Sequence, residues 1–177
     1  MGNESAARAP GDMSKSEFVD AFGEIYEHSP WVARDTWRRC CGRGLDSVEA
    51  VAAELAATLD AAGHDAKLAL IRAHPDLAGR AAVRGALSAA STREQAGAGI
   101  DQCSEAEYRK FQSLNDAYKA RFGFPFVMAV KGSDRHAILS AFEERLGNDA
   151  AAEFRRAMTE IHRIARFRLS AMGLPEA

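Results

Sequence analysis

The sequence predicts an all-α protein that contains one extended segment. Apolar side chains recur every three or four residues along most of the chain, and capping boxes led by serine precede two of these runs. The exception is a short apolar stretch at residues 124–130, which does not follow helical spacing. With 177 residues and a hydrophobic content of 47%, the chain has the size of a single domain around one core.

The first expected helix opens with the capping box of Ser14 and Glu17 and carries Phe18, Phe22, Ile25 and Tyr26 on one side. The other expected helices cover residues 31–41, 46–62, 65–73, 104–122, 135–146 and 149–170. Residues 1–13 are small and polar, and we expect a disordered tail there. The domain is therefore expected to cover residues 14–172.

The extended segment, Phe124 to Val130, is rich in aromatic and β-branched residues and is too short and proline-marked for a helix. No second strand in the sequence is available to pair with it, yet buried backbone amides need partners. Two interpretations stay open: the amides bind a ligand, or the segment is a loop whose backbone is satisfied by side chains and water.

Composition narrows the class of protein. The chain has 23 Lys and Arg against 25 Asp and Glu, so its net charge of −2 gives no reason to expect binding to nucleic acid. No apolar stretch predicts a signal peptide or a membrane span, and the three cysteines are expected to be free thiols, so we expect a cytoplasmic protein without membrane contact. No histidine or cysteine spacing typical of a metal site occurs.

The stretch from Arg72 to Gly79, RAHPDLAG, contains a candidate catalytic residue. His74 follows Ile71 by about one helical turn and so shares its inward face, while Pro75 moves His74 out of helical geometry and ends the helix. The imidazole is expected at a helix C-terminus, facing the core, where it could titrate near neutral pH. The alternative is a histidine that only caps the helix or packs in the core.

A second candidate lies on the last helix. Relative to Ile161, Arg168 falls within the apolar stripe, whereas the other arginines of the helix fall outside it. A guanidinium in that position needs a partner, either an internal carboxylate or an anionic ligand. The pattern does not decide between the two.

A third candidate is STREQAGAG, residues 91–99. Glu94 and Gln95 side by side can contact donors and acceptors of a planar, amide-like ligand, and Ser91 could join them. The alternative is structural, because Ser91 and Glu94 have the spacing of a capping box.

These stretches, together with SPWVAR (29–34), NDAYKARFGFPFVMAVKG (115–132) and EIHRIARFRL (160–169), resemble the 2-oxo-4-hydroxy-4-carboxy-5-ureidoimidazoline (OHCU) decarboxylase family. The similarity covers residues 14–170. It implies an all-helical fold, usually a homodimer, that acts in uric acid degradation and yields (S)-allantoin. It also implies catalysis with no cofactor, on a small-molecule substrate.

The resemblance implies a role for each candidate. The family's catalytic histidine corresponds to His74. Its substrate-binding residues correspond to Pro75, Ser91, Glu94, Gln95, the backbone of Phe126, Val127 and Met128, and Arg168. Two alternatives remain: an enzyme that acts on another ureide without releasing CO₂, and a helical ligand-binding module in which His74 and Arg168 are structural.

Overall fold

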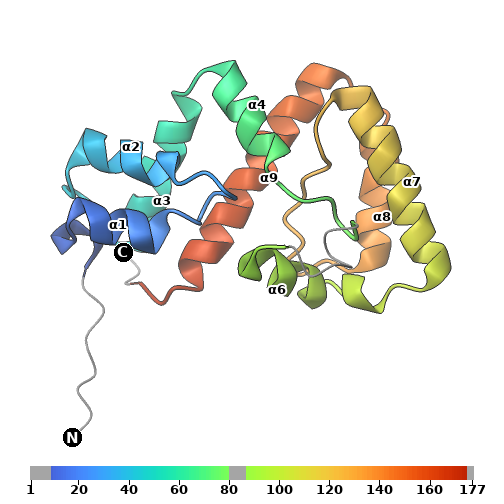
Figure 1. The fold of residues 1–177 in the computed structure, drawn as a ribbon, viewed down its shortest axis with the longest axis horizontal. Helices are drawn as coiled ribbons and strands as arrows, with labels where there is room; N and C mark the ends of the chain where they lie inside the picture. Colours follow the sequence, from blue (N-terminus) through green and yellow to red (C-terminus); the bar gives the residue numbers. More distant parts are fainter. Residues whose placement is uncertain (1–8, 80–86, 175–177) are drawn as a thin grey trace, which may run out of the picture. The chain divides into compact units, whose positions relative to one another are not determined.

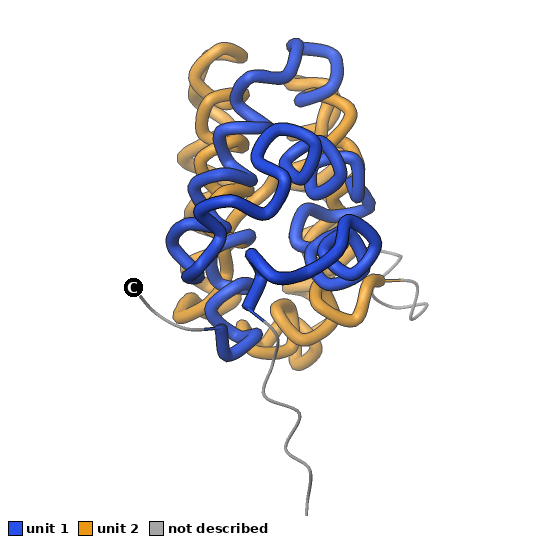
Figure 2. The backbone as a smooth tube through the Cα atoms, turned by 90° about the vertical axis from the view of Figure 1, so that its left-hand side faces the viewer, with its two compact units in different colours: residues 1–67, 165–177 blue, residues 68–164 orange. Residues whose placement is uncertain are grey.

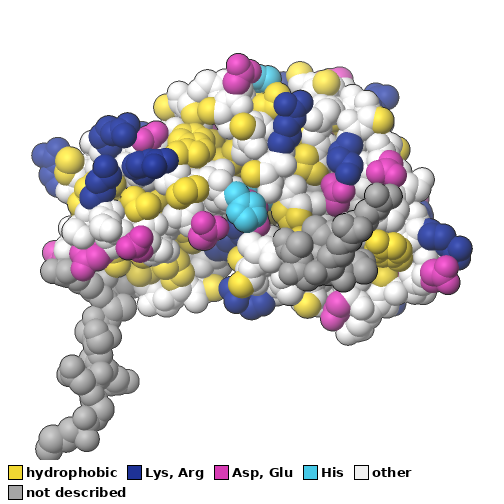
Figure 3. All heavy atoms as spheres, viewed as in Figure 1, with side chains coloured by type: hydrophobic (Ala, Val, Ile, Leu, Met, Phe, Trp, Pro, Cys, Tyr) yellow, Lys and Arg dark blue, Asp and Glu magenta, His cyan; other side chains and the backbone are white. Residues whose placement is uncertain are grey.

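The computed structural model describes residues 9–79 and 87–174, and these residues form helices and connecting segments without a strand (Figure 1). The all-α fold predicted from the sequence is confirmed. In the described ranges, no helix is both long and apolar enough to cross a membrane. On the face drawn in Figure 3, lysine and arginine side chains occur beside aspartate and glutamate, as the near-balanced composition leads one to expect.

The chain divides into two compact units, which Figure 2 shows in different colours. Unit 1 comprises residues 1–67 and 165–177, and unit 2 comprises residues 68–164. Unit 1 contains η1 (Pro10–Asp12), α1 (Lys15–Phe22), α2 (Trp31–Cys40), α3 (Val48–Asp60), the start of α4 (His64–Arg72) and the end of α9 (Ala150–Ser170). Unit 2 contains the rest of α4 and α9, with α6 (Ala89–Gly97), η2 (Ile100–Gln102), α7 (Glu105–Phe122) and α8 (Arg135–Arg145).

Local sequence signals explain where α1 and α3 begin. Ser14 and Glu17 form the predicted capping box of α1, and the hydroxyl of Ser47 accepts a hydrogen bond from an amide of the first turn of α3. The sequence interpretation extended the first helix too far, because α1 ends at Phe22, before Gly23. Ile25 and Tyr26 remain buried, but they lie in the turns that follow the helix.

The expected tail over residues 1–13 lies mostly outside the described residues. At its end, Pro10–Asp12 form the short helix η1, and Pro10 is buried. The three cysteines, Cys40, Cys41 and Cys103, are free thiols, as expected.

Unit 1 has a core of aromatic and aliphatic side chains. The ring of Phe18 lies 5.3 Å from that of Trp37, between centroids, and joins α1 to α2. Between α2 and α3, the buried hydroxyl of Thr36 donates to that of Thr58 over 2.7 Å, and Thr58 donates to the carbonyl of Glu54. Both buried hydroxyls are thus satisfied inside the unit.

Unit 2 is built around four aromatic rings: Phe111, Tyr118, Phe126 and Phe142 are all fully buried. Phe126 stacks on Phe142 with 3.7 Å between ring centroids, and Tyr118 meets Phe126 edge to face. Phe126 belongs to the non-helical segment, which is therefore fixed in the core by its aromatic side chain.

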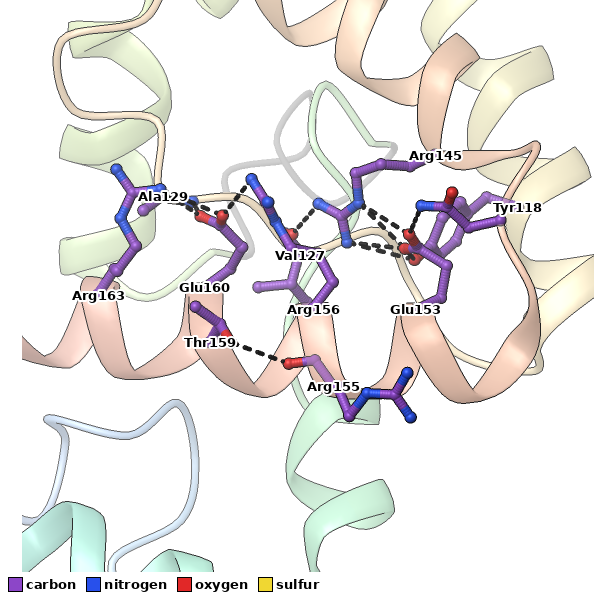
Figure 4. A network of polar contacts seen from close by, with 11 residues as sticks. Tyr118, Val127, Ala129, Arg145, Glu153, Arg155, Arg156, Thr159, Glu160 and Arg163 are labelled. Carbon is purple, nitrogen blue, oxygen red and sulfur yellow. Dashed lines mark hydrogen bonds and ion pairs between the residues drawn. The ribbon is translucent and has the colours of Figure 1, made fainter.

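A buried polar network lies beside these rings, and Figure 4 shows it from close by. Glu153 of α9, whose side chain is 0% exposed, accepts hydrogen bonds from Arg145 of α8, Tyr118 of α7 and Asn148. Burial alone would raise the pKa of Glu153, but these hydrogen bonds outweigh it and hold the pKa below its usual value. The stabilisation by Glu153 is therefore present at neutral pH and is lost as the pH falls through this lowered pKa.

Removal of the Tyr118 hydroxyl tests this network. Tyr118→Phe takes one donor from a buried carboxylate, and we expect the free energy of unfolding to fall by about 1–3 kcal/mol. Urea unfolding at pH 7 measures the change. Tyr108→Phe, on the same helix at a partly exposed position, is the control and should stay within about 0.5 kcal/mol of wild type. Equal effects of the two substitutions would contradict a role for the Tyr118 hydroxyl.

Candidate functional site

His74 lies two residues after the end of α4, with its side chain 8% exposed. The inward orientation predicted from the sequence is confirmed. Its Nδ1 lies 3.0 Å from the carbonyl oxygen of Leu70, in the last turn of the helix. A carbonyl can only accept, so Nδ1 carries the hydrogen, and Nε2 is the ring nitrogen that can exchange a proton.

The loop that follows His74 is held by polar side chains of α7. Lys119 pairs with Asp76 over 2.5 Å, Asn115 donates to the carbonyl of Leu77 over 2.8 Å, and Gln112 donates to the carbonyl of Ala78 over 2.6 Å. These three side chains are spaced three and four residues apart, so they project from one face of the helix. The loop is therefore positioned by α7 along its length.

Ala78 has an unusual backbone conformation within this loop. Its φ of 52° lies in the left-handed region, which costs energy for any residue with a Cβ. Both its backbone groups are taken, because its N–H donates to Gln95 over 3.1 Å and its carbonyl accepts from Gln112. Two glutamines from different helices thus hold a strained residue four positions after His74.

The helix that supplies Gln95, α6, begins earlier than the capping-box interpretation required. Its N-cap is Ser88, whose hydroxyl accepts a hydrogen bond from the amide of Ser91 over 3.2 Å. The structural alternative for Ser91, as the cap, is therefore wrong. Ser91 lies in the first turn instead, and it shares a helix face with Glu94 and Gln95.

Ser91 and Gln95 are both buried at 5% exposure, while Glu94 is partly exposed. Gln95 uses both ends of its amide on the loop, since it also donates to the carbonyl of Asp76 over 3.4 Å. The structure thus gives Gln95 a loop-holding role that the sequence did not predict. Its role in binding a substrate stays a prediction.

The segment from Phe124 to Val130 is non-helical, as predicted, and two of its backbone groups are bound by side chains. The carbonyl of Val127 accepts from Arg145 over 2.8 Å, and the amide of Ala129 donates to Glu160 over 2.9 Å. At these two positions, the interpretation of a loop satisfied by side chains is the correct one. Across residues 9–79 and 87–174, nothing accepts a hydrogen bond from the amide of Met128.

Arg168 belongs to unit 1 and is buried there at 8% exposure, as its place in the apolar stripe predicts. Its Nη2 pairs over 2.8 Å with Glu27, a carboxylate that is only 1% exposed, and its Nη1 lies 3.4 Å from the carbonyls of Glu24 and Ile25. The internal ion pair, one of the two alternatives, is therefore present. A guanidinium has five donors, so a ligand contact is compatible with it.

Unit 2 also contains a cavity of about 630 Å³ next to the loop. Its walls include Ala78, Gln95, Ile100, Cys103 and Tyr108. Neither His74 nor residues 126–128 line it, so it does not unite the predicted site. In the described parts of the chain, no cluster of three or more His, Cys, Asp or Glu side chains could hold a metal ion.

The sequence interpretation missed four buried charged residues, Glu27, Arg145, Glu153 and Glu160. Glu153 and Glu160 are separated by two helical turns and so share a face of α9, which is a recognisable signal. Nothing comparable in the sequence marks Glu27 or Arg145.

Comparisons with known proteins identify the family to which the chain belongs. Residues 11–170 match the profile of the family described as OHCU decarboxylase. The OHCU decarboxylase of Haloferax volcanii is 44% identical over 89% of this chain and 90% of its own length, and a human protein described as a putative OHCU decarboxylase is 39% identical with the same coverage of both chains.

Solved structures give the same answer. The crystal structure of an (S)-allantoin synthase matches with a TM-score of 0.73 and 30% identity over 91% of this chain, which spans 51% of that longer protein. A crystal structure of an OHCU decarboxylase in the presence of (S)-allantoin matches in fold, with a TM-score of 0.63 and 19% identity over 78% of this chain and 89% of its own. The chain is a helical enzyme domain of this kind, and it belongs to the OHCU decarboxylase family.

Replacement of Asn115 tests how the loop is held. Asn115→Leu keeps the side-chain shape but leaves the carbonyl of Leu77 without its donor, so we expect a loss of about 1–2 kcal/mol in the free energy of unfolding. The exposed neighbour Asp116→Ala is the control and should change little. Chemical denaturation measures both variants, and an unchanged midpoint for Asn115→Leu would show that this bond does not support the loop.

Proposed function

We propose that this chain catalyses the cofactor-independent decarboxylation of OHCU to (S)-allantoin in uric acid degradation. The observation that carries the proposal is His74, a buried imidazole held just after the end of α4, with its Nδ1 3.0 Å from the carbonyl oxygen of Leu70. Membership of the OHCU decarboxylase family supplies the reaction. A relative from Bacillus subtilis, 37% identical, is called a uric acid degradation bifunctional protein, and this chain covers 31% of it.

The substrate explains why no cofactor is needed. Its carboxylate is attached to a carbon that also bears a hydroxyl group and adjoins a ring C=N, so the electrons released with CO₂ have a sink within the substrate. The protein must orient the carboxylate and deliver a proton to one face of the ene-diol-like intermediate. His74 serves as the acid or base, through Nε2, on the hydroxyl or a ring nitrogen.

The remaining candidates bind the substrate in this proposal. Pro75 keeps His74 in place, and Ser91, Glu94 and Gln95 contact the ring and ureido groups. The backbone of Phe126 to Met128 binds a carbonyl, and the amide of Met128 is the donor best suited to it. Arg168 anchors an anionic or carbonyl edge.

We also propose that the protein is a homodimer, as the family resemblance implies, and that it acts in the cytoplasm, a reducing compartment that suits its three free cysteines. Size-exclusion chromatography with light scattering tests the oligomeric state. A mass that matches one chain of 19.1 kDa would contradict the dimer.

The decisive experiment follows the optical activity of the product. Urate is converted by the two upstream enzymes, urate oxidase and 5-hydroxyisourate hydrolase, with and without this protein, and circular dichroism records the allantoin formed. OHCU decays unaided to racemic allantoin, so this protein should accelerate the reaction and give one enantiomer. A racemic product at the spontaneous rate would overturn the proposal and favour the ligand-binding module.

Measurement of CO₂ separates the other alternative. An enzyme that opens or tautomerises another ureide would consume its substrate without releasing CO₂. Release of one CO₂ per OHCU consumed, faster than the spontaneous rate, supports decarboxylation.

His74→Asn tests the acid or base role. The asparagine amide can keep the bond to Leu70 but cannot exchange a proton, so we expect kcat to fall by about 100-fold or more with little change in Tm. His136→Asn, at an exposed position on α8, is the matched control and should retain wild-type turnover. Near-normal turnover of His74→Asn would exclude the assigned role.

Arg168 needs a paired design, because removal of the arginine alone leaves Glu27 buried without its cation. Arg168→Met should destabilise the fold by about 3 kcal/mol or more, and Arg168→Met with Glu27→Gln should recover much of that loss. If Arg168 also anchors the ligand, both variants lose affinity for allantoin in calorimetric titration. Wild-type affinity in the folded double variant would restrict Arg168 to a structural role.

A further inference from the structure

The non-helical segment of unit 2 is tied to α9 through two buried carboxylates. Glu153 and Glu160 are both 0% exposed and lie two helical turns apart, and Figure 4 shows them on the same side of the helix as Val127 and Ala129. Glu160 binds the segment directly, through the amide of Ala129. Glu153 acts through Arg145, which donates to the carbonyl of Val127.

Two arginines compensate the buried negative charge of Glu160. Arg156 pairs with it over 2.9 Å and Arg163 over 3.2 Å, from one turn before and one turn after, and both arginine side chains are about half exposed. Their charges compensate the carboxylate from the surface. The carboxylate oxygen Oε2 of Glu160 also accepts a hydrogen bond from the amide of Ala129, which is itself buried.

Arg145 fixes the neighbouring position in two ways. Its guanidinium donates to the carbonyl of Val127 over 2.8 Å and lies over the ring of Phe126, 4.3 Å from the ring centroid. The pair with Glu153 in turn fixes Arg145. Residues 126, 127 and 129 are thus each held by a side chain from α8 or α9.

This arrangement determines which way the residue between them faces. The carbonyl of Val127 faces Arg145 of α8, and the amide of Ala129 faces Glu160 of α9. The peptide bond between Val127 and Met128 is trans, so the N–H of Met128 points away from the side on which Arg145 lies. Met128 is partly exposed, whereas Val127 and Ala129 are each 3% exposed.

We infer that Glu160 is a positioning residue for substrate binding, which fixes the amide of Met128 toward the substrate by holding the amide of Ala129. Glu160 contacts no substrate itself. The inference rests on the proposed function, in which the backbone of residues 126–128 binds a substrate carbonyl.

The test compares Glu160→Ala with Glu160→Gln in the full chain. Alanine removes the acceptor for the buried Ala129 amide, whereas glutamine keeps an acceptor oxygen and loses only the charge. We expect KM for OHCU to rise about tenfold in the alanine variant, the equivalent of one lost hydrogen bond, with a smaller change in kcat. The glutamine variant should restore most of the wild-type KM.

Arg156→Ala and Arg163→Ala are the matched controls. Each removes an ion pair of Glu160 but leaves the bond between carboxylate and amide in place, so KM should stay within about twofold of wild type. Amide hydrogen exchange gives a readout that does not depend on activity. It should quicken across residues 126–130 in Glu160→Ala and remain slow in both arginine variants.

A second route to the same bond is Ala129→Pro, which is informative if Glu160→Ala fails to fold. Proline removes the N–H itself, and it favours an extended conformation at Met128. The same rise in KM is expected. A folded Glu160→Ala or Ala129→Pro enzyme with wild-type KM would overturn the inference, and so would an equal rise in KM for Glu160→Gln.

These outcomes are distinct from failure of the proposed function. If the wild-type protein forms no (S)-allantoin, the decarboxylase proposal falls before any variant is compared. If the wild type is active and Glu160→Ala binds OHCU normally, only the positioning role is lost.

Discussion

The burial of Glu153 beneath Arg145 is the interaction on which unit 2 depends. Through this pair, α7, α8, α9 and the non-helical segment meet at one place, because Tyr118 and Asn148 also donate to Glu153 and Arg145 also reaches Val127. Removal of one partner from a buried ion pair typically costs about 3–5 kcal/mol, against a total stability of about 5–15 kcal/mol for a domain. Unit 2 is therefore expected to be much more stable with the complete network than with one of the partners removed.

Two non-helical segments of unit 2 are held by side chains that project from helices. The loop after His74 is bound by Gln95, Gln112, Asn115 and Lys119, and the Phe124 to Val130 segment by Arg145 and Glu160. A backbone outside regular structure can present its groups to a ligand, and rigid helices then supply the precision that a loop lacks. Polar and charged side chains are buried in the otherwise apolar core because they hold the backbone of these two segments in place.

Periodicity and capping chemistry predicted the helices because these signals are local. Ser14 with Glu17 and Ser104 with Glu107 each form the capping box that the sequence indicated. Local signals can mislead where two nearby serines could each cap the same helix, as at α6, where Ser88 rather than Ser91 is the cap. They also overestimate the length of a helix when buried residues follow its end. Ile25 and Tyr26 are such residues, because they are buried although α1 has already ended.

The candidate site was predictable in part. The inward orientation of His74 follows from one helical turn and one proline, and the low exposure of the Arg168 side chain follows from its place in the apolar stripe. The partner of Arg168 does not follow, because Glu27 lies 141 residues away in sequence. Arg145 was missed for a related reason: a charged residue of a helix looks the same in sequence whether it meets solvent or a buried partner.

Ala78 has a consequence for how this loop can change over time. A residue in the left-handed region that is not glycine keeps its shape because its surroundings impose it, and here two glutamines do so. Glycine at position 78 would relax the local strain and at the same time widen the range of shapes open to the loop. A glycine would thus leave the loop less well defined, whereas alanine makes the conformation of the loop depend on the glutamines of α6 and α7.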